Sequence, residues 1–135
     1  MPSFIQSNTQ SGLIVRQPTA DFTGAEGLLA KQSTTALQVS LAGVGDLALF
    51  VVTEVEASNG TDPTAQRVTL QPLSGERNAR AICAAAITAG ATVASTTGGL
   101  LHIAVTGDQI IGVAEDSTSA SGAYCLFRPA NLGTK

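Results

Sequence analysis

Residues 91–130 read ATVASTTGGLLHIAVTGDQIIGVAEDSTSASGAYCLFRPA, and this stretch decides the fold class. Short apolar segments recur in it at a spacing of about ten residues. Turns that carry glycine separate the segments, at Thr97–Gly99, at Thr106–Asp108 and in the loop through Gly122. Such a pattern is typical of the antiparallel strands of a small sandwich or barrel. We therefore predict a mainly β fold for the chain.

The β pattern continues upstream as far as residue 46. Residues 47–56, LALFVVTEVE, are apolar and β-branched, and residues 66–73, QRVTLQPL, alternate between apolar and polar. The Asn-Gly and Asp-Pro turn signals between them predict a hairpin with a long tip. In residues 78–87, NARAICAAAI, the alanines favour a helix. Because this run is short and is followed at once by Gly90 and another extended segment, we expect a strand there instead.

Residues 1–45 differ from the rest of the chain. They are rich in Gln, Ser and Thr and show no sustained period of 2 or 3.6 residues. Glycines interrupt the segment and argue against a long helix, although residues 25–37 leave room for a short one. We predict an extended N-terminal arm and irregular segment over residues 1–45, followed by a β-rich domain of short antiparallel strands over residues 46–135.

The arm is a candidate for binding a partner. Its apolar residues would add a strand to the exposed sheet edge of a neighbouring protein, with backbone hydrogen bonds supplying affinity. A frayed chain end is the alternative interpretation. The candidate partner-binding residues are Phe4, Ile5, Leu13, Ile14, Val15 and Arg16.

The composition points to a protein that associates with other surfaces. Of the 135 residues only 13% are charged, about half of the roughly 25% in typical soluble domains. Weak like-charge repulsion favours association, although a monomer with a polar, uncharged surface remains an alternative. The net charge of −3 and seven scattered Lys and Arg residues argue against nucleic-acid binding. With neither an apolar run long enough for a membrane span nor a signal-like start, we expect cytoplasmic synthesis.

The chain offers few groups for catalysis, and we expect that it is not an enzyme. The single histidine, His102, stands among apolar residues in LLHIAV and is expected to be a half-buried structural residue. Cys83 and Cys125 are expected to be free buried thiols. We predict no catalytic residue, no cofactor and no metal site. A small hydrolase that uses Cys83 or Cys125 is a third hypothesis, which an active Cys-to-Ala double variant would exclude.

Four further motifs receive structural interpretations. Glu115-Asp116 is expected in a solvated turn, and Gly43–Asp46 precedes a strand, unlike a phosphate-binding loop. Tyr124 is expected in the core, which weakens a glycan site because sugars stack on exposed aromatic rings. Gly90 and Gly99 are expected at positive φ in tight turns, and Gly112 at a bulge or a close backbone approach.

Residues 80–130 resemble the capsid decoration, or cement, proteins of tailed bacteriophages. The similarity lies in the segment Thr88–Val93, in Gly98-Gly99 before a strand, in Ile111–Ala114, and in the acidic pair and small-residue loop before the last apolar strand. The order and spacing of these elements carry more weight than any single residue. Residues 1–45 do not match the family pattern.

The resemblance implies a structural accessory protein on the outer surface of a phage capsid. Such a protein would bind the major capsid protein, associate with itself, commonly as a homotrimer, and cement neighbouring capsid subunits without turnover. The virion would be its location, after synthesis in the bacterial host cytoplasm. A virion-borne host-surface or glycan-binding module is the alternative, and density at capsid three-fold sites or at fibre tips would distinguish the two.

Overall fold

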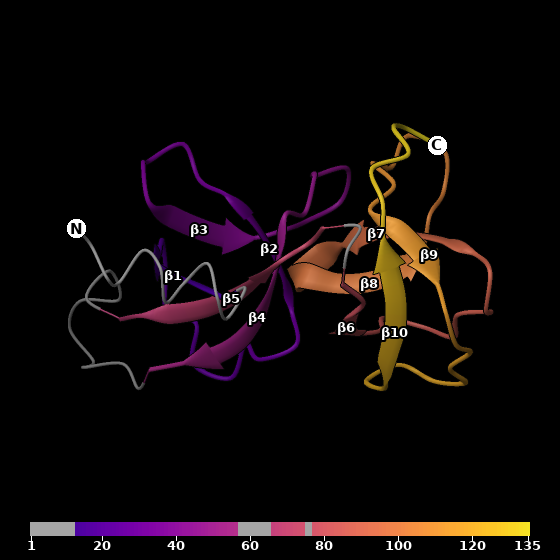
Figure 1. Ribbon diagram of the computed structural model, residues 1–135, viewed down its shortest axis with the longest axis horizontal. Helices are drawn as coiled ribbons and strands as arrows, with labels where there is room; N and C mark the ends of the chain where they lie inside the picture. Colours follow the sequence, from indigo (N-terminus) through magenta and orange to yellow (C-terminus); the bar gives the residue numbers. More distant parts are fainter. Residues whose placement is uncertain (1–12, 57–65, 75–76) are drawn as a thin grey trace.

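The computed structural model describes residues 13–56, 66–74 and 77–135, and its fold is mainly β, as predicted. Five strands form a closed barrel in the order β1-β3-β2-β4-β5, and five more form a second sheet in the order β6-β10-β9-β7-β8. The barrel strands are β1 (Ile14–Pro18), β2 (Leu29–Gln32), β3 (Gln38–Leu41), β4 (Phe50–Val55) and β5 (Val68–Pro72). The others are β6 (Ala79–Ile82), β7 (Thr92–Thr96), β8 (Leu100–Ile103), β9 (Gly112–Ala114) and β10 (Tyr124–Pro129). Figure 1 shows the barrel on the left and the second sheet on the right.

Strand β1 closes the barrel because each of its halves pairs with a different neighbour. Its first residues pair antiparallel with β5, Ile14 opposite Leu70, and its last residues pair parallel with β3, Gln17 opposite Gln38. The predicted hairpin is confirmed, since β4 and β5 pair antiparallel, with a register shift between Val52 and Glu54. Its tip at residues 57–65 lies outside the described residues.

The second sheet contains the strands predicted in residues 78–130. The expected strand in residues 78–87 is β6, which pairs with β10. A single parallel bridge from Cys83, just after β6, to Leu101 of β8 joins the first and last strands of the sheet order. The sheet therefore curls towards closure.

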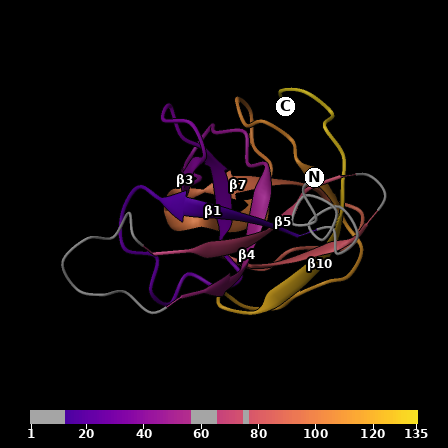
Figure 2. The ribbon, with the colours of Figure 1, turned by 60° about the vertical axis from the view of Figure 1, so that its left-hand side comes forward.

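One hydrophobic cluster holds both sheets together. Leu29 of β2 and Val51 of β4 belong to the same buried cluster as Val93 of β7 and Phe127 of β10, whose side chains are fully or almost fully buried. A second buried cluster fills the barrel around Val39, Val68 and Leu70. In Figure 2, β7 lies behind the barrel strands, which agrees with this packing.

Residues 14–45 are more ordered than the expected arm and irregular segment. Strands β1, β2 and β3 all lie in this range and form three of the five barrel strands. No helix forms between residues 25 and 37, where β2 pairs with β3 and β4 instead. The physical reason is barrel closure, because the closed barrel supplies hydrogen-bond partners for the backbone N–H and C=O groups of these short polar strands. Their sequences alone show no strand-like alternation.

Glycines occupy the predicted tight positions. Gly90 and Gly99 have φ of 87° and 79°, as expected. The expected close approach at Gly112 is also confirmed, because a Cβ built there would collide with the carbonyl oxygen of Arg128 and lie 2.8 Å from the ring of Phe127. The backbone of β10 therefore packs directly against the backbone of Gly112, with no room for a side chain between them.

Candidate functional site

Residues of the predicted arm fall into two groups. Ile14, Val15 and Arg16 lie in β1 and pair antiparallel with Leu70, Thr69 and Val68 of β5, so one edge of this segment is part of the chain's own barrel. Leu13 directly precedes β1 and is half-buried. Phe4 and Ile5 lie outside the described residues.

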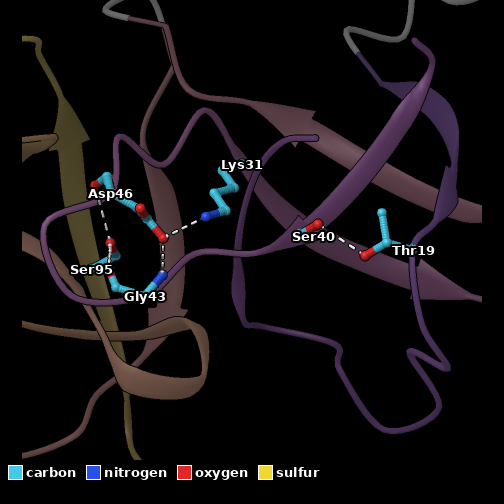
Figure 3. A network of polar contacts seen from close by, with 6 residues as sticks. All are labelled: Thr19, Lys31, Ser40, Gly43, Asp46 and Ser95. Carbon is cyan, nitrogen blue, oxygen red and sulfur yellow. Dashed lines mark hydrogen bonds and ion pairs between the residues drawn. The ribbon is translucent and has the colours of Figure 1, made fainter. Parts of the chain in front are cut away.

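A polar network joins the barrel to the second sheet at the turn before β4 (Figure 3). The carboxylate of Asp46 accepts hydrogen bonds from Nζ of Lys31 on β2, at 2.9 Å, and from the backbone N–H of Gly43, at 2.8 Å. The hydroxyl of Ser95 on β7 donates to the carbonyl oxygen of Gly43 at 2.8 Å. The Gly43–Asp46 motif is therefore a structural turn held by both sheets.

The surroundings of Asp46 favour its charged form. The hydrogen bond from Lys31 and then the backbone N–H of Gly43 hold its pKa below the ordinary value of 3.8. Both partners stabilise the charged carboxylate. The turn is therefore most strongly held at a pH where Asp46 is ionised.

His102 is half-buried as predicted, but it has an acidic neighbour that the sequence analysis did not identify. Its Nε2 lies 2.8 Å from Oδ2 of Asp108, although this contact does not meet hydrogen-bond geometry. Oδ2 of Asp108 also accepts a hydrogen bond from the backbone N–H of Val105 at 2.9 Å. The Thr106-Gly107 turn reverses the chain towards β8 and so brings Asp108 close to His102. This turn is the sequence signal that could have indicated the contact. No nucleophile joins the pair among the described contacts.

The two cysteines are free and buried, as predicted. Burial, followed by a hydrogen bond from the thiol to Asp116, raises the pKa of Cys125 to about 12. Such a thiol stays protonated near neutral pH, whereas a nucleophilic cysteine requires a thiolate. This environment does not favour Cys125 as a nucleophile.

The acidic pair is exposed, as expected for a solvated turn, yet both carboxylates have partners. Glu115 forms an ion pair with Arg128 at 2.9 Å. Oδ1 of Asp116 accepts a hydrogen bond from the backbone N–H of Leu126 at 3.0 Å. Within the described residues, no group of three or more His, Cys, Asp or Glu side chains is arranged to hold a metal ion.

Tyr124 is not in the core, and this expectation is wrong. Its side chain is 52% exposed and lines a groove of about 360 Å³ between the barrel and the second sheet. Its hydroxyl lies against Gly27, where a Cβ would come within 2.7 Å of the oxygen. Polar side chains complete the groove, including Glu26, Asn78 and Arg80. We name this surface the Tyr124 groove.

An apolar groove of about 240 Å³ lies on another part of the same junction. Leu47 and Leu49 from the segment before β4 form one side and remain 38% and 39% exposed. Leu73, Ile110 and Pro129 also line it, and Asn131 is the only polar residue among its described lining. We name this surface the apolar groove.

Neither groove is predictable from the sequence, because each is assembled from segments far apart in the chain. The apolar doublet Leu47 and Leu49 is visible in the sequence, but its partial exposure depends on how the two sheets meet. Among the described residues, no helix is long and apolar enough to cross a membrane.

Comparison with known proteins identifies the fold. No protein-family profile and no curated protein sequence matches the chain. A solved structure, the head fiber gp8.5 N base of bacteriophage phi29, has a similar fold, with a TM-score of 0.64 at 13% sequence identity. The similarity covers 91% of this chain and 97% of the fiber base chain. The chain therefore shares the architecture of that fiber base along nearly its whole length.

Proposed function

We propose that the chain is a structural accessory protein of a phage virion, which binds the outer capsid surface and cements neighbouring major capsid subunits. The observation that carries this proposal is the fold shared with a phage head fiber base over 91% of the chain. The resemblance of residues 80–130 to decoration proteins supports the same class from separate features. Both similarities support a structural role in a phage virion.

The surface of the molecule suits such a role. Val44 and Leu132 are 66% and 55% exposed. In the sequence they stand close to Leu47 and Asn131, which line the apolar groove. Burying apolar surface contributes about 25 cal/mol per Å², so modest contacts become strong when a capsid repeats them. No turnover or cofactor enters this proposal, and the buried, protonated thiol of Cys125 agrees with it.

Cementing is tested by the stability of heads that lack the protein. Heads from a phage without this gene should break at a lower temperature than complete heads, and adding the purified protein should restore their resistance. Equal resistance with and without bound protein would exclude cementing, while leaving simple attachment to the head.

The arm is tested by a truncation that respects the barrel. Removing residues 1–12 leaves β1 intact, whereas a longer deletion would remove Ile14–Pro18 and open the barrel. If the arm contacts the capsid or a neighbouring copy, the truncated protein should occupy heads less completely than the full chain. Unchanged occupancy would contradict a role for the arm.

Self-association is tested on the isolated protein. Size-exclusion chromatography with light scattering should give the mass of three chains if the homotrimer forms before binding. A strict monomer at high concentration would restrict self-association to the capsid surface.

Binding of host-surface glycans is a second candidate function, and the exposed Tyr124 favours it. An accessible aromatic ring beside Glu26, Asn78 and Arg80 provides both stacking and hydrogen-bonding groups for a sugar. Tyr124→Ala should then reduce adsorption of virions to host cells without changing head occupancy, while Tyr124→Phe retains most adsorption. Normal adsorption of the alanine variant would exclude this function for the groove.

A further inference from the structure

The described chain begins beside the apolar groove. Ile14 pairs with Leu70, so the antiparallel register places Leu13 opposite Gln71, two residues before Leu73. Leu73 lines the groove, and its N–H donates to the carbonyl oxygen of Leu49 at 2.8 Å. At about 3.4 Å per residue, Leu13 starts roughly 7 Å along β5 from a groove wall.

The segment before Leu13 contains one pair of large adjacent apolar residues, Phe4 and Ile5, in MPSFIQSNTQSG. Ile5 stands eight residues before Leu13, and the residues between them are Gln, Ser, Asn, Thr and Gly. A random-coil link of this length has a root-mean-square span of about 16 Å. This span exceeds the roughly 7 Å that separates Leu13 from Leu73 along β5, so the link is long enough for Phe4 and Ile5 to reach the groove.

We propose that the apolar groove binds Phe4 and Ile5 of the same chain. The groove offers partly exposed leucines to an apolar pair, and burial of both partners removes apolar surface from water. A short link gives its own segment an effective concentration of about 1 mM, which a second copy reaches only at high protein concentration. This inference does not depend on the virion role.

The binding is tested with a tryptophan at position 4. The chain contains no tryptophan, so Phe4→Trp in the full-length protein supplies a single fluorescent reporter. Its emission should be blue-shifted and protected from acrylamide quenching. Both properties should stay constant between about 1 and 100 μM protein, well below the effective concentration of the linked segment.

Charged substitutions locate the reporter in the groove. Adding Leu49→Glu to Phe4→Trp should abolish the blue shift and raise quenching to that of an unfolded control. Leu37→Glu is the matched control, because Leu37 is 65% exposed and lies before β3, at the opposite end of that strand from the groove segment. It should leave the emission unchanged. Circular dichroism verifies folding, and Leu47→Glu replaces Leu49→Glu if the latter does not fold.

Three results would overturn the proposal. The first is a tryptophan as accessible in the folded protein as in denaturant. The second is an unchanged blue shift in a folded groove variant. The third is a blue shift that grows with protein concentration, which would place the segment in a second copy.

Discussion

Gly112 occupies a place on β9 where the backbone of β10 leaves no room for a side chain. An added Cβ would collide with the carbonyl oxygen of Arg128. We expect Gly112→Ala to lower the free energy of unfolding by about 1–3 kcal/mol, the usual cost of overpacking. Urea denaturation measures the change.

Gly43→Ala is the matched control for this substitution. The backbone of Gly43 is not at positive φ, and an added Cβ would meet only Oδ2 of Asp46, at 3.4 Å. We expect a change within about 0.5 kcal/mol. Equal losses in the two variants would contradict the close approach of β10 to Gly112.

The ion pair of Asp46 predicts a pH-dependent stability difference. Because the folded-state pKa of Asp46 is lowered, the carboxylate stabilises the fold above its unfolded pKa, and this contribution is lost as the pH falls through the folded pKa. We expect Asp46→Asn to cost about 0.5–1 kcal/mol at pH 7, since the pair is partly exposed. The difference should shrink below about pH 4.

Urea denaturation at pH 7 and pH 3 checks this expectation. Glu54→Gln, which neutralises an exposed carboxylate on β4, is the control and should change little at either pH. A cost of Asp46→Asn that stays constant down to pH 3 would show that charge is not what holds the turn.

At the residue scale, a position is predictable from the sequence where backbone geometry determines the residue type. It is not predictable where the burial of a side chain depends on the tertiary fold. Gly112 is predictable because a glycine inside an apolar strand indicates close contact. Tyr124 is not, because β10 places it at the junction beside Gly27 rather than in the core. The partnership of Asp108 with His102 depends on a turn whose path the sequence does not specify.

The turn between β3 and β4 depends on one hydroxyl of the second sheet. Ser95 is 1% exposed, and its hydroxyl donates to the carbonyl oxygen of Gly43. We expect Ser95→Ala to cost about 1–3 kcal/mol, because it leaves this carbonyl without its side-chain donor. Faster hydrogen exchange in residues 42–49 is the accompanying signature.

Ser40→Ala is the control, at a separate hydrogen bond that Figure 3 also shows. Ser40 is partly exposed and hydrogen-bonds only to the hydroxyl of Thr19 through its side chain, at 2.9 Å. Its loss should cost no more than about 0.5 kcal/mol. If Ser95→Ala lowered the free energy of unfolding as little as Ser40→Ala does, the polar network would not be what joins the turn to β7.

The strands from β4 onwards were predictable, whereas β1, β2 and β3 were not. Strands β7, β8 and β10 follow apolar segments between glycine turns, which is a local signal. Strands β2 and β3 have four residues each and include Lys31, Gln32 and Gln38, so they lack such a signal. They form because closure of the barrel supplies partners that are distant in the sequence.

The whole molecule should unfold as one cooperative unit. Leu29 and Val51 of the barrel share a buried cluster with Phe127 of the second sheet. We expect Phe127→Ala to cost about 3–5 kcal/mol and to accelerate hydrogen exchange in both sheets. Two separate unfolding transitions, or faster exchange in the second sheet alone, would show that the sheets are independent.

The position of the protein on virus particles tests the proposed function most directly. Electron microscopy of virions of the encoding phage, with and without the gene, measures this position. The proposal predicts difference density on the outer head surface, at sites that bridge neighbouring major capsid subunits. Absence of the protein from the particles, or density only at fibre tips, would contradict it.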